Sequence, residues 1–480
     1  MASEDKQAFY SRMILAWIVT GVTFMELLDT SILNTAIPVL GKALGTNIFE
    51  VKAAVTAYLA ALAVFIPASG WIADALGTKI TMMSAVSLFT ASSLACGFSS
   101  SVEQLVFFRV LQGIGGAMMT PVSRLILVRL FKGEELARAA GLVAIPIVFG
   151  PILGPLLGGY ITTKFHWSWI FFINVPIGIL ALTLIGLKLK NEKAARMPPF
   201  DLKGFLLAGF GLAALTFALE NADNPLFPGW LTVLLLLSGA ALAWFTARHC
   251  MRAPGKVFDM TLFRLRTFRG GLLMLLIGVV AAGGLQLLLP VEFQLGFGMT
   301  PLQSGLLTFY VALGSVAVKP FIVPICGRLG YRKVLTLFPV AMAAAVFSFC
   351  LFSPEYPGWL IGTQLFFYGL CFSFLGNMIN VIPYTEVDRE RTGKAISLQS
   401  TIFQFSLSLG VSLSSLLLGV FLKFSGAELG GPSGAGALRS FRFCFAAMGV
   451  LCLLIALSNM RFHSGDFAPL AGKNTHPAGD

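Results

Sequence analysis

Charged side chains are scarce in this chain of 480 residues. Asp, Glu, Lys and Arg make up only 12% of it, against a usual share of about 25%, whereas 56% of the residues are hydrophobic. Such a composition leaves too few polar groups to cover the surface of a water-soluble protein of this length. It excludes a soluble globular protein and indicates a chain that lies largely in a lipid bilayer.

Histidine is rarer still, which bears on catalysis. The four histidines, His166, His249, His463 and His476, all fall in predicted loops or in the C-terminal tail. No Ser-His-Asp pattern, H-E-x-x-H motif or P-loop is present. A membrane-embedded enzyme would need a nucleophile, a metal cluster or an acid–base pair near one face. We therefore expect a protein that is not an enzyme.

Paired cysteines are absent as well. The seven cysteines are scattered, mostly inside apolar segments, without a C-x-x-C pair or a histidine at zinc-ligand spacing. We expect them to be reduced packing residues, and we expect neither a metal nor another cofactor.

Long apolar segments are abundant. About 14 of them have about 20 residues each, the length that a helix needs to cross a hydrocarbon core of about 30 Å. They begin near residues 13, 51, 80, 104, 137, 168, 203, 229, 270, 303, 332, 358, 394 and 440. Helices satisfy their own backbone polar groups in lipid, and the strand alternation of porins is not visible. The sequence therefore predicts an all-α polytopic membrane protein.

The positions of the basic residues predict the topology. A net charge of +12 also suits a nucleic-acid binder, but the Lys and Arg residues are concentrated in loops. With loops assigned alternately, about 25 of them fall on the side of the N-terminus and about 6 on the other. The basic loops are 188–203, 248–269, 328–333 and 389–394. We expect both termini in the cytoplasm and no nucleic-acid partner.

An internal repeat predicts the domain organisation. The segment from Gly70 to Lys79 follows the second span, and a degraded copy from Pro324 to Lys333 follows the tenth, about 253 residues later. Six helices with their loops need about 190 residues, so the offset fits two six-helix units separated by an extra helical pair. We expect a six-helix bundle over 1–190, a linker with a two-helix insert over 191–268, a second bundle over 269–461 and a disordered cytoplasmic tail over 462–480.

Five motifs, in order along the chain, resemble the major facilitator superfamily. They are LDTSILNTAIP (28–38), GWIADALGTK (70–79), RVLQGIGGA (109–117), GPILGPLLGG (150–159) and WSWIFFINVPIG (167–178). Within that family the chain is similar to the 14-helix drug:proton antiporters of the QacA and EmrB type, and to their MdtD- and HsrA-like subgroup. The likeness extends over nearly the whole length and implies the major facilitator fold.

The resemblance also implies a function. It is that of a proton-coupled antiporter in the cell inner membrane, which exports small lipophilic, cationic or neutral, drug-like compounds by alternating access. The proton gradient would supply the energy, and the protein would work as a monomer among membrane lipids. An exporter or flippase of a lipid, a siderophore or another endogenous metabolite on the same fold is the alternative, because cavity shape decides the substrate.

Glu26 and Asp29 are the candidate proton-coupling carboxylates. They lie three residues apart in the first span and share a helical face, where a charge needs a partner or a cavity. At a rise of about 1.5 Å per residue, Asp29 and Arg109 both lie about 8 to 11 Å below the outer surface, so we expect them to meet. A conformational change that alters their burial or pairing would load or release a proton. The alternatives are a static buried pair and, for Glu26, attraction of a cationic substrate.

The loop after the second span is the candidate conformational latch. In the resembling family its acidic residue, here Asp74, pairs with basic groups at the inner end of the fourth span and with a helix N-terminus, and Arg129 is the candidate partner. Gly70 and Gly77 permit close approach of backbone, and Lys79 is the remaining basic member.

This chain departs from the family pattern of the latch at three positions. Ala75 and Thr78 stand where the family usually has arginine, so we expect a weaker contact. Gly327 stands where the second half would carry an acidic residue, so we expect no equivalent latch there.

A glycine–proline segment resembles the helix that marks exporters in this family. Its glycines recur every four residues, which lets a neighbouring helix approach closely, and its prolines bend it. The residues of this antiporter motif are Gly150, Pro151, Gly154, Pro155, Gly158 and Gly159.

Polar side chains within the spans are the candidates for the substrate path: Asn34, Gln112, Glu292, Lys319, Asn377 and Asn380. Lys319 would neutralise an anionic substrate or Glu292, or else extend toward the cytoplasmic interface. Glu292 lies at the outer end of the ninth span, where a solvated side chain is the ordinary expectation.

Overall fold

The computed structural model is helical in the part of the chain that it describes. These residues are 2–46, 48–131, 135, 149–150, 153–154, 156–162, 164–193, 199–223, 228–252, 258–388, 391–425 and 434–459. Within them, 13 helices are long and apolar enough to cross a membrane, and their positions confirm 13 of the predicted spans. The remaining span, near residue 137, falls mostly outside the described residues.

Contacts divide the chain into two compact units. The first comprises 1–261 and 388–401, and the second comprises 262–387 and 402–480. The boundaries expected at 190 and 268 remain predictions, and the expected disordered tail lies outside the described residues.

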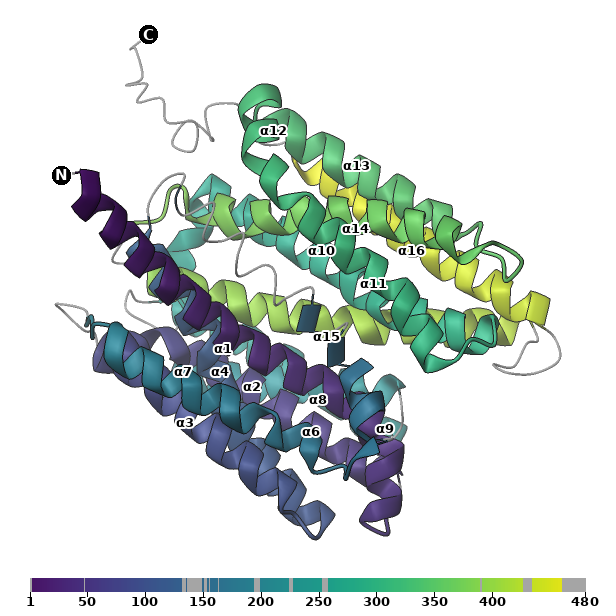
Figure 1. The fold of residues 1–480 in the computed structure, drawn as a ribbon, viewed down its shortest axis with the longest axis horizontal. Coiled ribbons are helices and arrows are strands. Elements are labelled where there is room, and N and C mark those ends of the chain that lie inside the picture. The colour runs from purple at the N-terminus through teal and green to yellow at the C-terminus, as the bar shows by residue number, and fades with distance from the viewer. Residues whose placement is uncertain are drawn as a thin grey trace. The chain divides into compact units, whose positions relative to one another are not determined.

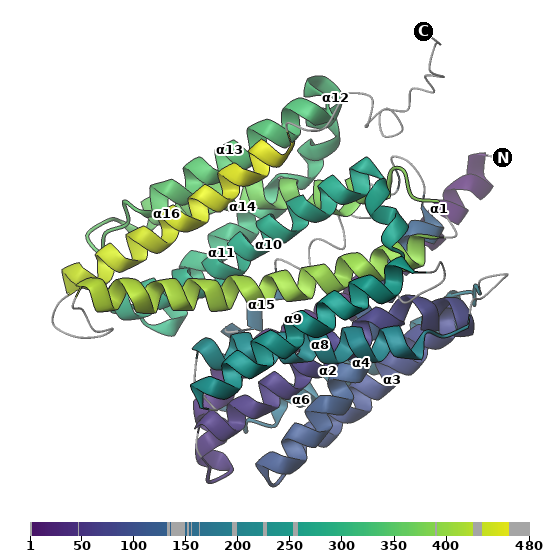
Figure 2. The same cartoon turned by 180° about the vertical axis from the view of Figure 1, so that it is seen from behind.

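In the first unit, α4 packs against α1, α2 and α3, while α7 packs against α1 and α3 (Figure 1). The two insert helices, α8 and α9, pack on each other, and α8 also packs on α2 (Figure 2). The helices of this unit are α1 (Ala2–Ala43), α2 (Ile48–Leu76), α3 (Thr78–Gly97), α4 (Val102–Leu130), α6 (Trp169–Phe172), α7 (Asn174–Lys188), α8 (Leu202–Asp223) and α9 (Gly229–Met251).

Glycines let α4 approach its neighbours backbone to backbone. A Cβ atom built at Gly113 would lie 2.6 Å from the carbonyl oxygen of Tyr58 in α2. One built at Gly115 would lie 2.8 Å from the carbonyl oxygen of Ala85 in α3. Both distances are shorter than any real contact of a methyl group, so α4 is wedged between α2 and α3.

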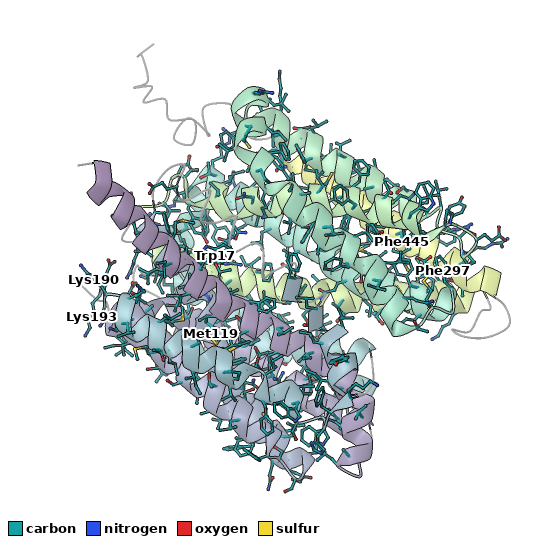
Figure 3. All side chains as sticks on the ribbon, viewed as in Figure 1. Trp17, Met119, Lys190, Lys193, Phe297 and Phe445 are labelled. Atoms are coloured by element: carbon teal, nitrogen blue, oxygen red, sulfur yellow. The ribbon has the colours of Figure 1, made fainter. Side chains whose placement is uncertain are left out.

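In the second unit, α11 packs on α14, and α16 packs on α10 and α13, around a core rich in phenylalanine. Two of its aromatic residues, Phe297 and Phe445, are labelled in Figure 3. The elements are the turn η1 (Met260–Arg264), α10 (Arg266–Val291), the π-helical turn η2 (Glu292–Gly296), α11 (Pro301–Ala317), η3 (Lys319–Phe321), α12 (Ile322–Leu329), α13 (Tyr331–Phe349), α14 (Gly358–Val381), η4 (Ile382–Tyr384), α15 (Thr392–Ser425) and α16 (Gly434–Asn459). The first ten residues of α15 are grouped with the first unit.

Candidate functional site

A strip of buried polar side chains runs between α1 and α4. The two helices are antiparallel there, because Asp29 contacts Arg109, Glu26 contacts Thr120, and the carbonyl of Val19 accepts a hydrogen bond from Ser123, 3.2 Å away. We call Glu26 and Asp29, with the facing Arg109, Gln112 and Thr120, the polar strip. Its two carboxylates are 7% and 1% exposed.

Asp29 accepts hydrogen bonds from three side chains. Its Oδ2 lies 2.5 Å from Nη1 of Arg109, and its Oδ1 lies 2.9 Å from Nε2 of Gln112 and 2.8 Å from Nδ2 of Asn174. The contact predicted between Asp29 and Arg109 is therefore present. Donors directed at both oxygens stabilise the ionised carboxylate, which burial alone would destabilise.

Arg109 is also held through its flat face. Its Cζ lies 4.1 Å from the centroid of the Tyr58 ring, a cation–π geometry. The same Nη1 that binds Asp29 lies 2.9 Å from Oε1 of Gln112, while Nε and Nη2 have no acceptor among the described residues. Gln112, which we expected on the substrate path, is thus part of the Asp29 network.

Asn174 is a functional candidate that sequence reasoning missed. It opens α7, and its Nδ2 donates to Asp29 and also lies 3.1 Å from Oγ of Ser93 in α3. Two helices besides α1, namely α4 and α7, therefore meet at this carboxylate, and α3 contacts Asn174 behind it. The available signal was a single amide within an apolar segment, inside the motif at 167–178.

Glu26 has a less polar environment than Asp29. It accepts a hydrogen bond from the hydroxyl of Thr120, a neutral donor. Arg124 lies one helical turn further along α4, close enough to act on Glu26 electrostatically. We did not count Arg124 among the site residues, although an arginine inside a predicted span was a visible signal.

The candidate latch is assembled in the first unit. Nη2 of Arg129 lies 2.6 Å from Oδ1 of Asp74, and both side chains are largely buried. A Cβ atom built at Gly393 would lie 3.1 Å from Oδ2 of Asp74, so the carboxylate adjoins the first turn of α15. One built at Gly70 would lie 2.7 Å from the carbonyl oxygen of Gly393. The predicted contact with Arg129 is present, and the latch function stays a prediction.

The described part of the antiporter motif packs on α1. A Cβ atom at Gly150 would lie 2.8 Å from Cβ of Leu27, and one at Gly154 would lie 2.6 Å from Cβ of Ser31. The hydroxyl of Ser31 also donates to the carbonyl of Gly150, 2.8 Å away. The hydroxyl of Thr162 donates to the carbonyls of Gly158 and Gly159, and a Cβ atom built at Gly159 would meet no described atom within 4 Å. Pro151 and Pro155 lie outside the described residues.

In the second unit, Glu292 departs from expectation. It is 1% exposed rather than solvated, and it begins the π-helical turn that follows Pro290. Its Oε2 has no hydrogen-bond partner among the described residues. Arg442 of α16 is close enough to act on this carboxyl electrostatically, and a buried carboxyl with an unbonded oxygen is a candidate for function.

The remaining substrate-path candidates are dispersed. Nζ of Lys319 is enclosed in the protein without a described partner, and no described ion pair joins it to Glu292, so both roles expected for it stay predictions. Asn377 is buried with an unpaired Oδ1, whereas Asn380 donates to Gly376 of its own helix. The side chain of Asn34 lies outside the description.

The described residues contain no cluster of metal-ligating side chains, and none of the seven cysteines, all of them described, forms a disulfide. The ionisable groups that the polar strip offers are two buried carboxylates and a buried arginine.

Comparison with known proteins identifies the family. The family model described as Major Facilitator Superfamily matches residues 19–290 and again residues 272–476. MdtD of Salmonella typhi, which is named as a multidrug resistance protein, is 35% identical over 443 residues, 92% of this chain and 93% of its own. MdtD of Salmonella paratyphi A shows the same identity and coverage.

Solved structures agree on the fold. The proton:xylose symporter XylE aligns with 94% of this chain and 96% of its own, at a TM-score of 0.65 and 15% identity. The human organic anion transporter MFSD10 aligns with 93% and 99%, at a TM-score of 0.62 and 14% identity. The chain therefore belongs to the Major Facilitator Superfamily, whose members are multi-pass membrane transporters and not enzymes.

Proposed function

We propose that the protein is a proton-coupled antiporter that exports small lipophilic compounds, cationic or neutral, by alternating access. The observation that carries this proposal is the polar strip, where two buried carboxylates on one helix face differ in their donors. The name of the MdtD relatives supports drug-like substrates. The basic loops support an inner-membrane location with both termini in the cytoplasm.

The geometry suggests how a proton is coupled to movement. Asp29 is held as a carboxylate by donors from α4 and α7, so it takes up a proton only when those helices withdraw Arg109, Gln112 and Asn174 from it. Return of the donors expels the proton. Alternation between the two arrangements would exchange a proton for substrate across the membrane.

A second candidate function is the export of an anionic lipid or metabolite. The observation that favours it is Lys319, whose ammonium group is enclosed in the second unit without a described partner. An anionic headgroup would pair with it.

Transport by the purified protein in proteoliposomes tests the proposal. An imposed proton gradient is combined with matched lipophilic cations, neutral compounds and anions. We expect proton-dependent uphill movement of the cations and neutral compounds, and proton counterflow when they are added. Movement of the anions alone would favour the second candidate, and movement without any dependence on the proton gradient would contradict antiport.

Replacement of Glu26 by glutamine separates its roles. The amide still accepts the hydrogen bond of Thr120, but it carries no charge. If Glu26 attracts cationic substrates, a lipophilic cation should bind about 10- to 100-fold more weakly, the usual effect of losing a contact with a buried charge. A neutral isostere should bind as before. Isothermal titration of both ligands measures this, and equal losses for the two would show that Glu26 acts on packing instead.

A further inference from the structure

The turn between α2 and α3 has unusual capping. It contains Gly77, whose φ of 94° is a left-handed conformation that favours glycine, and this residue provides no side chain to cap α3. The first amides of α3 and the last carbonyls of α2 therefore need partners from elsewhere.

One amide side chain from a distant segment meets these needs. Oδ1 of Asn191 lies 3.2 Å from the backbone nitrogen of Lys79 and 3.4 Å from that of Ile80, at the start of α3. Its Nδ2 lies 3.0 Å from the carbonyl oxygen of Leu76, at the end of α2. Asn191 thus caps two helices at once, although it follows α7 by three residues.

The next residue extends the contact to the latch. The carbonyl oxygen of Glu192 lies 3.2 Å from the backbone nitrogen of Thr78 and 3.3 Å from Nη1 of Arg129. Through its other terminal nitrogen, Arg129 binds Asp74. Nζ of Lys79 lies 2.6 Å from the carbonyl of Gly186 in α7. We call Asn191 and Glu192 the clamp.

We propose that Asn191 is a positioning residue for the latch: by tying the α2–α3 turn to the segment after α7, it holds Asp74 between Arg129 and the first turn of α15. Ala75 and Thr78 bring no charged side chain to this turn, and Asn191 and Glu192 supply the contacts that tie it to the segment after α7. Asn191 stays exposed, and so do its neighbours Lys190 and Lys193, which are labelled in Figure 3.

The latch can be monitored without any substrate. Ser397 of α15 is 1% exposed, and its hydroxyl lies 3.1 and 3.0 Å from the carbonyl oxygens of Ile66 and Pro67 in α2. In a Ser397→Cys protein, a water-soluble maleimide should react only when the start of α15 leaves α2. Six of the seven native cysteines are buried, so their labelling can be subtracted with the parent protein.

Asn191→Ala, made in the Ser397→Cys protein, should raise the labelling rate about five-fold, the factor expected from loss of one capping side chain. Asn191→Asp should label at a rate between those of the parent and of the alanine protein, because a carboxylate still accepts from the α3 amides but cannot donate to the carbonyl of Leu76. Lys193→Ala, an exposed neighbour, is the matched control and should change nothing.

A double-variant cycle decides whether Asn191 acts through Asp74. Asp74→Asn should raise the labelling rate on its own, and adding Asn191→Ala should not raise it further. An unchanged rate in Asn191→Ala, or effects of the two substitutions that multiply, would overturn the inference. If the alanine protein does not fold, Asn191→Ser replaces it in both experiments. Its side chain is too short to reach both helices, so the same rise in labelling rate is expected.

The transport readout rests on the proposed function. Asn191→Ala should slow turnover about five-fold without changing the substrate dissociation constant, because it affects a latch and not a ligand. If labelling responds as expected but no compound is moved against a proton gradient in any variant, the proposed function fails and the inference about Asn191 stands.

Discussion

Asp29→Asn should abolish transport driven by a proton gradient. An asparagine cannot take up or release a proton, so the exchange cycle loses its coupling step. One pH unit corresponds to about 1.4 kcal/mol, so an exchanger that moves one proton per substrate sustains about ten-fold accumulation across it. The variant should sustain none. Proteoliposomes with an imposed pH difference measure the accumulation ratio, and neutral substrates should still bind.

The control for this variant concerns folding. Asp29→Asn leaves Arg109 buried without its counter-charge, and breaking a buried pair in this way costs about 3 to 5 kcal/mol. The double variant Asp29→Asn, Arg109→Met removes both charges and should recover thermal stability. If it also recovers uphill transport, Asp29 is a structural partner of Arg109 and the coupling proton lies elsewhere, with Glu26 and then Glu292 as the next candidates.

Gly154→Ala should give the second large effect. The added methyl group would collide with Ser31, and overpacking of this kind costs about 1 to 3 kcal/mol, because one of the two segments must shift. Ser31 lies two residues from Asp29 on α1, so the shift misaligns the carboxylate with its donors. We expect the transport rate to fall about 5- to 100-fold and the midpoint of thermal unfolding to fall as well.

The same motif provides the matched control. Gly159→Ala adds the same methyl group where nothing lies within 4 Å, and it should leave both rate and unfolding midpoint unchanged. Equal effects of the two substitutions would mean that the motif requires glycine for its backbone and not for contact with α1.

Sequence reasoning reached the spans and the charge pairs because each has a strong local signal. The length of the apolar segments predicted the 13 described membrane spans. The equal distance of Asp29 and Arg109 from the outer ends of their helices predicted that they meet. The pairing of Asp74 with Arg129 followed from the family resemblance. Asp29 and Arg109 are costly to bury alone, so a partner was implied for each of them.

The parts that were missed depend on tertiary arrangement. Nothing in the spacing of Asn174 shows that α7 lies beside α1, and Asn191 in an exposed segment looks like any polar loop residue. The solvated position expected for Glu292 was wrong, because the packing that buries a side chain at a helix end is set by the tertiary fold. Predictions of which way a side chain faces assume an unbroken α-helix, and a π-helical turn such as 292–296 departs from that regular period.

The wedging of α4 between α2 and α3 also limits how this protein can diverge. At Gly113 and Gly115 any side chain meets a neighbouring backbone, which cannot move aside as a flexible side chain does. Natural selection should therefore remove substitutions at these two glycines, because they disturb helix packing whatever compound the protein exports. New substrate preferences would therefore arise through replacements at other positions, while these two glycines of α4 stay unchanged.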